Sequence, residues 1–104
     1  MSSWSAKLPF TEESVRQHVR DFGGVYRLIC KKGEGCLVFY VGSAAHLETT
    51  LLDLAHGVAQ SPRLAEYLHN TGVEFRFFPT DDAFERSRVE DVELAKWHPC
   101  CNGR

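Results

Sequence analysis

The sequence has no long hydrophobic run. Nowhere do about 18 apolar residues follow one another, so no membrane-spanning helix is predicted. The first ten residues contain one lysine and no apolar stretch of the kind that a secretory signal peptide needs. We therefore expect a cytoplasmic protein whose thiols are reduced.

An excess of positive charge is also missing. Lysine and arginine number 12 against 14 acidic residues, and the formal net charge is −2. Proteins that hold nucleic acid mainly through its phosphates are usually basic. This balance argues against strong, sequence-independent binding of nucleic acid, although it is compatible with a local basic patch.

Regular metal-binding patterns are absent too. The spacing of the four cysteines matches no common zinc motif, and the five histidines form no HxxxH or HExxH pair. A zinc site could be assembled from Cys30, Cys36, Cys100 or Cys101, and His98, but cysteines packed in the core are the favoured interpretation. A redox role for Cys100 and Cys101 is a further alternative.

What is present suits one packed domain. The chain has 104 residues, of which 43% are hydrophobic and 25% charged. We expect a single domain over residues 1–104, with a core over about 22–103. A helix over about 11–22 precedes this core, with Thr11 as its N-cap, and residues 1–9 are expected to form a loose lead-in.

The central feature is a predicted β-hairpin over 24–42. Two runs rich in Val, Ile, Leu, Phe and Tyr flank the polar segment KKGEG. A loop over 31–35 would place Cys30 opposite Cys36, and Tyr26 would then face Tyr40 directly. Two adjacent phenols indicate either a chemical site or ordinary cross-strand packing, and spacing alone favours packing.

Three helical segments and one strand are expected after the hairpin. Apolar residues recur at helical spacing over 47–58, and Ser61-Pro62 begins a second helix. A third strand is predicted over 73–78. The last helix is expected to begin with Thr80 as its cap and to run to about Trp97, where Pro99 stops it.

The last helix carries an acidic residue in its apolar stripe. At about 100° per residue, Ala83, Leu94 and Trp97 fall within one narrow arc. Glu90 lies inside that arc, and Glu93 lies well outside it. A carboxylate at such a position must be paired, protonated, metal-bound or directed to a cleft, unless the stripe is simply the edge of the helix.

Four short motifs together resemble the GIY-YIG nuclease superfamily, including its small stand-alone members. They are Gly24-Val25-Tyr26, Tyr40-Val41-Gly42, Glu90 in the last helix, and Asn102 after the proline. Their order and spacing match over roughly residues 22–103. The resemblance implies an α/β (α+β) domain with a three-stranded antiparallel sheet flanked by helices, in the order α-β-β-α-α-β-α.

The resemblance also implies a chemistry. Active members of this superfamily cut phosphodiester bonds with one divalent metal ion, here Mg²⁺ or Mn²⁺. By resemblance, Tyr26 helps to activate the attacking water, and Tyr40 assists proton transfer or binds a phosphate oxygen. Glu90 holds the metal, and Asn102 fixes the local geometry. A metal ion held by a carboxylate and waters suits this chemistry.

One residue departs from the family pattern. The superfamily has an arginine eight residues after the second motif, and this sequence has Thr50 there. Basic side chains that could contact substrate in its place are Arg27, Arg76 and His46, none of which matches the pattern. Gly42 of the second motif is also assigned to substrate binding.

Two functions follow as alternatives. The first is a metal-dependent endonuclease acting on DNA, with activity weakened by Thr50. The second is a catalytically inactive, nuclease-like module that binds nucleic acid or a protein partner. The first requires the phenols of Tyr26 and Tyr40 to share a pocket with Glu90.

Overall fold

The computed structural model describes residues 3–70 and 72–102, so the ends of the expected domain and Thr71 lie outside the described part. Its elements are β1 (Leu8–Pro9), α1 (Glu12–His18), β2 (Gly24–Lys32), β3 (Gly35–Ala44), α2 (Leu47–Ala55), α3 (Pro62–Leu68), β4 (Glu74–Pro79) and α4 (Ala83–Trp97). The strands form one antiparallel sheet in the order β1-β4-β2-β3. No described helix is long and apolar enough to cross a membrane.

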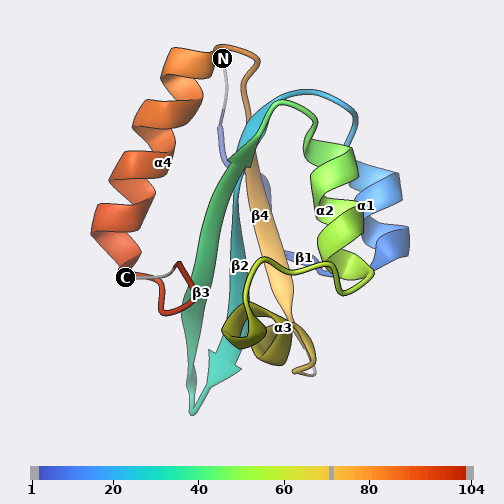
Figure 1. Cartoon of the computed structure of the whole chain (residues 1–104), viewed down its shortest axis with the longest axis vertical. Coiled ribbons are helices and arrows are strands. Elements are labelled where there is room, and N and C mark those ends of the chain that lie inside the picture. Colours follow the sequence, from blue (N-terminus) through green and yellow to red (C-terminus); the bar gives the residue numbers. More distant parts are fainter. Residues whose placement is uncertain (1–2, 71, 103–104) are drawn as a thin grey trace.

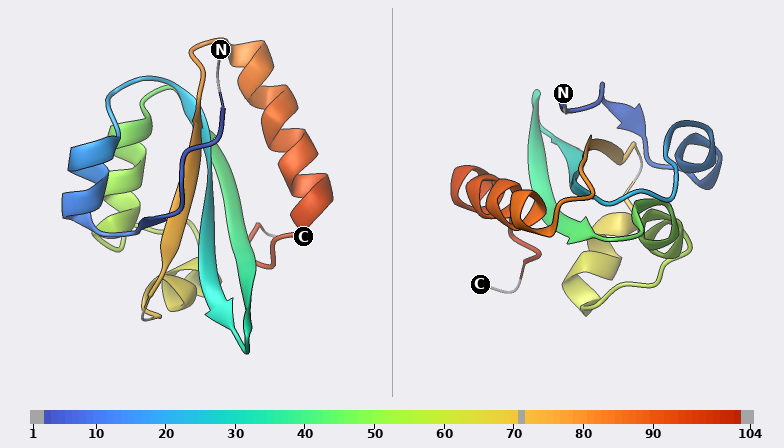
Figure 2. Two further views of the ribbon diagram at one scale, coloured as in Figure 1. Left: turned by 180° about the vertical axis from the view of Figure 1, so that it is seen from behind. Right: turned by 90° about the horizontal axis from the view of Figure 1, so that it is seen from above.

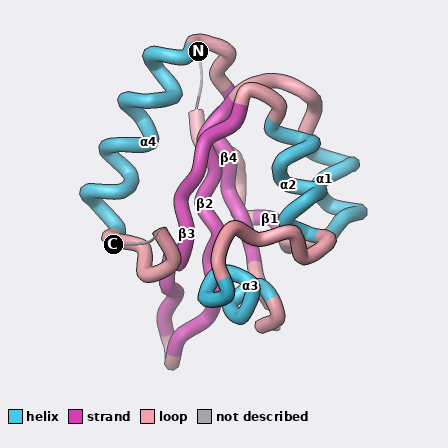
Figure 3. The backbone as a smooth tube through the Cα atoms, viewed as in Figure 1, coloured by secondary structure: helices cyan, strands magenta, loops and turns pink. Residues whose placement is uncertain are grey.

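The sheet is covered by helices on both faces. Figures 1 and 2 show α1 and α2 on one side of the strands and α4 alone on the other. The backbone tube in Figure 3 shows the same arrangement, with α3 near the turn end of the hairpin. A large apolar cluster fills the side of α1 and α2, and a smaller one around Val25, Ile29, Val38 and Val41 lies under α4.

The sheet has four strands where the sequence predicted three. The additional strand is β1, which lies in the segment that was expected to be a loose lead-in. Residues before it also follow β4, because Ser5 donates its N–H to Phe77 and its hydroxyl accepts the Phe77 N–H. A strand of two residues leaves no periodic signal in the sequence, so backbone pairing alone reveals it.

The predicted register of the hairpin is wrong. The turn is only Gly33-Glu34, with Gly33 at φ 60°, so Lys31 rather than Cys30 pairs with Cys36. A bulge between Leu28 and Ile29 adds a second offset, and Tyr26 therefore pairs with Gly42.

The total shift is two residues, which is the period of side chains along a strand. Tyr26 and Tyr40 therefore still belong to the same face and pack in the same cluster.

Two helices end earlier than the sequence predicted, and other predicted helix boundaries are confirmed. Thr11 does cap α1, but this helix stops at His18 instead of residue 22, because Val19 is already extended. The helix predicted over 47–58 ends at Ala55. Ser61 caps α3 and α4 ends at Trp97, as predicted.

The cap of α4 is Asp82 and not Thr80. The Asp82 side chain accepts hydrogen bonds from the N–H groups of Phe84 and Glu85. Asp82 is a better cap because its carboxylate reaches two free N–H groups of the first turn. The Thr80 hydroxyl instead accepts a hydrogen bond from the Asp82 N–H.

The carboxylate buried by α4 is Glu93, which the wheel placed outside the apolar stripe. Glu93 is 4% exposed, and its Oε1 accepts hydrogen bonds from Arg27 at 2.6 Å and from the Trp97 indole at 3.0 Å. Arg27 projects from β2, and its guanidinium lies 4.0 Å from the Trp4 ring. This buried pair fixes α4 against the sheet.

Candidate active site

Tyr26 and Tyr40 are neighbours on the face of the sheet that α1 and α2 cover. Their ring centroids are 6.1 Å apart, with the ring planes at 37°. Tyr26 is 3% exposed, whereas Tyr40 is half-buried. The bulge in the hairpin places them diagonally instead of directly opposite one another, and this diagonal distance suits contact between large side chains.

Gly42 makes room for the Tyr26 ring. A Cβ atom added at Gly42 would lie 2.5 Å from the Tyr26 hydroxyl oxygen and 2.6 Å from the ring carbon that bears it. Gly42 is the cross-strand partner of Tyr26, so the ring lies over the glycine. Any larger residue would force the phenol out of its position.

Gly42→Ala should therefore displace Tyr26 and lower the free energy of unfolding by about 1–3 kcal/mol, the usual cost of overpacking a buried site. Gly35→Ala is the matched control in the same strand, because its added Cβ would lie no closer than 3.9 Å to another residue. Denaturant unfolding of both variants measures the difference. Equal stability of the two would contradict this role of Gly42.

Glu90 projects from α4 toward the end of the second motif. Its Oε1 accepts a 2.8 Å hydrogen bond from the hydroxyl of Ser43, the residue that follows Gly42. Ser43 was not a candidate on sequence grounds, although its place directly after the motif was an available signal. The hydrogen bond links α4 to β3 and fixes one oxygen of the carboxylate.

Burial and charge both act on the phenols. Burial raises the pKa of Tyr26 far above its usual 10, and Tyr40 and the negative charge of Glu90 raise it further. Burial also raises the pKa of Tyr40, partly offset by a hydrogen bond from Tyr26, while Glu90 again raises it. Glu90 therefore lies close enough to influence both phenols, which stay protonated at neutral pH.

Asn102 ties the segment after α4 to β3. Its side-chain oxygen accepts the Val41 N–H at 3.0 Å, and its side-chain nitrogen donates to the Val41 carbonyl at 2.7 Å. The side-chain amide of Asn102 thus pairs with Val41 as a backbone amide of a neighbouring strand would. The turn leading to it begins at His98, which has the left-handed φ of 46°. This pairing fixes the backbone between Tyr40 and Gly42.

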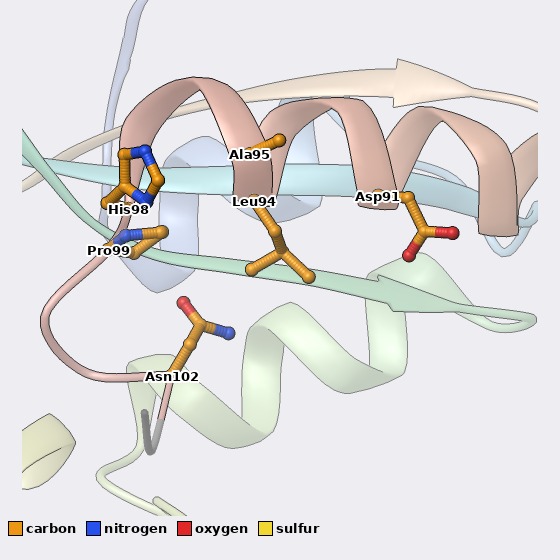
Figure 4. Close-up of a pocket in the computed structure, with 6 residues that line it drawn as sticks. All are labelled: Asp91, Leu94, Ala95, His98, Pro99 and Asn102. Carbon is orange, nitrogen blue, oxygen red and sulfur yellow. The ribbon is translucent and has the colours of Figure 1, made fainter.

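Two pockets meet at Asn102. One, of about 480 Å³, lies between the end of α4 and the following segment, and Figure 4 shows Asp91, Leu94, His98 and Asn102 around it. The other, of about 240 Å³, includes Tyr40, Ser61, Leu64 and Asn102. Tyr40 therefore has access to a surface hollow, whereas Tyr26 and Glu90 line neither of these two pockets, so the single pocket expected for the three residues is not among them.

The structure does not bring the predicted basic residues to the tyrosines. Arg27 contacts Glu93 on the α4 face, and its cross-strand partner Arg76 donates to the Ser5 carbonyl. His46 precedes α2 and forms an exposed pair with Asp21 at 3.3 Å. Of the four predicted substrate-binding residues, Gly42 alone contacts a tyrosine of the site.

One exposed cation that the sequence did not single out acts on residues close to Tyr40. Arg63 lies at the start of α3, and its positive charge acts on the Cys101 thiol and the Tyr67 phenol. Ser61 and Leu64, on either side of Arg63 in the chain, line the pocket of Tyr40. Arg63 is thus next to two lining residues in the chain, although it does not itself line this pocket.

Glu90 is suited to hold a divalent metal ion that keeps most of its waters, and not one that is enclosed by several protein ligands. Within residues 3–70 and 72–102, no three His, Cys, Asp or Glu side chains gather where they could hold a metal. This also excludes the zinc site considered for the cysteines and His98 within that part. Mg²⁺ commonly keeps several waters and uses one or two carboxylates with substrate phosphates, so the partly exposed Glu90 fits as one ligand.

No protein-family model and no curated protein matches the sequence. The structure is similar to solved structures of the GIY-YIG N-terminal endonuclease domain of UvrC from Thermotoga maritima. A tyrosine-to-phenylalanine mutant of that domain has 21% identity and a TM-score of 0.62, and an asparagine-to-alanine mutant has 20% and 0.63. Both comparisons cover 88% of this chain and 98% of that domain, which is bound to its catalytic divalent cation. This chain therefore has a GIY-YIG-like fold, as its motifs predicted.

Proposed function

We propose that this chain is a divalent-metal-dependent endonuclease that cuts phosphodiester bonds of DNA. The observation that carries the proposal is the contact of Tyr26 with Tyr40, together with Glu90 of the last helix, which bonds Ser43 next to Gly42 and whose charge acts on both phenols. The UvrC domain with the same fold binds its catalytic cation, which supports a metal-dependent reaction here. We place the activity in the cytoplasm, in a single domain over residues 1–104.

Each residue has a role that suits its surroundings. Glu90 holds the divalent ion, Mg²⁺ or Mn²⁺, which when bound would stabilise negative charge on the phosphate and lower the pKa of a bound water. Tyr40 reaches a surface hollow, so it can donate a hydrogen bond to a phosphate oxygen or pass a proton. Tyr26 is buried and packs against the Tyr40 ring, which restricts the orientation of that phenol. Asn102 holds the strand that carries Tyr40.

The electrostatics favour binding of DNA that is weak and depends only modestly on salt. The net charge is −2, and Thr50 supplies no cation on α2 to hold the phosphate that is cut. Arg63, whose charge acts on Cys101 in the lining of the hollow beside Tyr40, is our candidate for the contact, in place of Arg27, Arg76 and His46. With few basic contacts, affinity should fall only modestly with each increase in salt, and it should be low throughout.

A cleavage assay tests this function directly. The purified chain is incubated with branched, nicked and single-stranded DNA in Mg²⁺ or in Mn²⁺. We expect cutting of at least one of these substrates that stops when a chelator removes the metal and resumes when metal is restored. If every DNA remains intact with either metal, the proposed activity is wrong.

Thr50 favours one alternative, a nuclease-like module that binds DNA without cutting it. Thr50 is uncharged and stands where the superfamily has an arginine that would offset the negative charge developing on the phosphate. Such an interaction is worth several kcal/mol in comparable sites. A gel-shift experiment on the same DNA molecules separates the two functions. Retarded but uncut DNA would support the binding module.

A further inference from the structure

Two adjacent thiols lie in the segment that follows α4 and forms hydrogen bonds with β3. The Sγ atoms of Cys100 and Cys101 are 3.6 Å apart. Cys101 is 6% exposed, whereas Cys100 is half-buried and lies beside the Tyr67 phenol. Neither forms a disulfide, and neither has a role in the proposed reaction.

The two thiols precede the residue that fixes the active-site strand. The Cys101 N–H donates to the Phe39 carbonyl at 3.0 Å, and the Asn102 side chain pairs with both backbone groups of Val41. These anchors hold the strand on either side of Tyr40. Any change in the backbone at Cys101 is therefore passed directly to the contacts that position Tyr40.

We propose that Cys100 and Cys101 are a redox-sensitive pair, which a hydroperoxide converts to a reversible vicinal disulfide that releases Asn102 from Val41. In the first step the Cys100 thiol gives up its proton and its sulfur attacks hydrogen peroxide, so that an S–O bond forms as the O–O bond breaks. The sulfur is oxidised to a sulfenic acid, and the expelled hydroxide takes the proton released by the thiol and leaves as water. The Cys101 sulfur then attacks the sulfenic sulfur and expels a second water. Two thiols and one hydrogen peroxide thus give one disulfide and two waters.

Exposure and burial assign the order of these steps. Cys100 is the more accessible of the two thiols, so it meets the oxidant first. Burial raises the pKa of Cys101 to about 12, helped by hydrogen bonding to Cys100, so this thiol is a poor initial nucleophile. Its sulfur is nevertheless already in contact with that of Cys100, where it can resolve the sulfenic acid.

Strain makes the bond reversible and explains its effect on the strand. Most disulfides join Cα atoms about 4.4–6.8 Å apart, whereas adjacent Cα atoms are only about 3.8 Å apart. The sulfurs must also approach from 3.6 Å to about 2 Å. Strained disulfides are the more easily reduced ones, which suits a switch. The backbone that must distort is the one that carries the Cys101 and Asn102 contacts to β3.

The experiment uses the full chain treated with hydrogen peroxide and then with a dithiol reductant. Peptide mapping by mass spectrometry should find a Cys100–Cys101 disulfide that the reductant removes. Hydrogen exchange at the Val41 amide, which Asn102 protects, should become about tenfold faster after oxidation and slow again after reduction. Cys100→Ser should abolish both changes, and Cys36→Ser, an exposed position near the hairpin turn, should abolish neither.

Two results would overturn the inference. One is a stable disulfide that joins Cys100 or Cys101 to Cys30, the buried thiol of β2 whose pKa these neighbours influence. The other is a Cys100–Cys101 disulfide that leaves exchange at Val41 unchanged.

If the proposed function is right, oxidation should also reduce DNA cutting, because it releases the strand that carries Tyr40. This expectation rests on the proposed function, whereas the disulfide found by peptide mapping and the exchange rate at Val41 do not. A chain that never cuts DNA but shows both changes would disprove the proposed function and support the switch. A chain that cuts DNA equally well after the disulfide has formed would contradict control of the site by this pair.

Discussion

Glu93→Ala should lower the free energy of unfolding by about 3–5 kcal/mol, a large part of the roughly 5–15 kcal/mol expected for a domain of this size. The substitution leaves the Arg27 guanidinium buried without its carboxylate. The two side chains are only 13% and 6% exposed, so water cannot replace the lost partner. The Trp97 indole N–H loses its acceptor at the same time.

The surroundings of Arg27 explain why relaxation cannot recover this loss. Its guanidinium lies over the rings of Trp4 and Trp97, at 4.0 and 5.3 Å from their centroids. Its cross-strand neighbour Arg76 carries a charge of the same sign. Without Glu93, Arg27 has lost its carboxylate while Arg76 still lies opposite it, and repulsion adds to the cost of desolvation.

An exposed pair in α1 provides the matched control. Glu12 lies 3.1 Å from Arg16 and 2.9 Å from His56, with about half of each side chain exposed, so Glu12→Ala should cost much less than Glu93→Ala. Urea denaturation followed by tryptophan fluorescence is well suited, because both tryptophans of the chain contact Arg27. A Glu93→Ala loss no larger than that of Glu12→Ala would show that the buried pair does not stabilise the fold.

A double variant separates the cost of an unpaired charge from the value of the pair. Arg27→Met with Glu93→Leu replaces both partners by apolar side chains of similar length. We expect this variant to be much more stable than Glu93→Ala, because replacing a whole buried ion pair is often nearly neutral. Equal destabilisation of the two would mean that packing, and not charge, governs this site.

Local signals in the sequence predicted most elements of the fold. Thr11 and Ser61 act within one turn of themselves, so their effects could be inferred from neighbouring residues. The register of the hairpin could not, because the turn is shorter than the polar segment KKGEG suggests and a bulge adds a further offset. Strand β1 likewise exists only through its pairing with β4.

The candidate site shows the same division. The motif residues Tyr26, Tyr40, Glu90 and Asn102 could be found in the sequence. In the structure the two phenols pack together, Glu90 bonds Ser43 beside the second motif, and Asn102 pairs with Val41. The surroundings of these residues could not be found in the same way. A helical wheel with no partner surface cannot show which carboxylate meets an arginine, so it misplaced Glu93. For the same reason Arg27 looked available for substrate.

Glu90→Ala should reduce metal-dependent cutting by about 100-fold or more, the scale expected when a group that stabilises transition-state charge is removed. The free energy of unfolding should change little, because Glu90 is partly exposed and accepts one hydrogen bond from the exposed Ser43. Cutting rates on the preferred DNA, measured beside denaturant unfolding, separate a lost metal ligand from a damaged fold. Glu85→Ala, on the same helix, is the matched control and should cut normally.

The phenols provide a second measurement that does not depend on cutting. The charge of Glu90 helps to raise the pKa of both Tyr26 and Tyr40, so Glu90→Ala should move both pKa values down, toward the ordinary 10. A tyrosine whose pKa is higher in the folded than in the unfolded state stabilises the fold, and this contribution is lost as pH rises above about 10. Glu90→Ala removes part of that contribution, so the free energy of unfolding of the variant should fall less steeply with pH in alkali. A titration of tyrosinate absorbance detects this shift. Lost cutting with unmoved phenols would place Glu90 away from the tyrosines, and unchanged cutting would exclude it as the metal ligand.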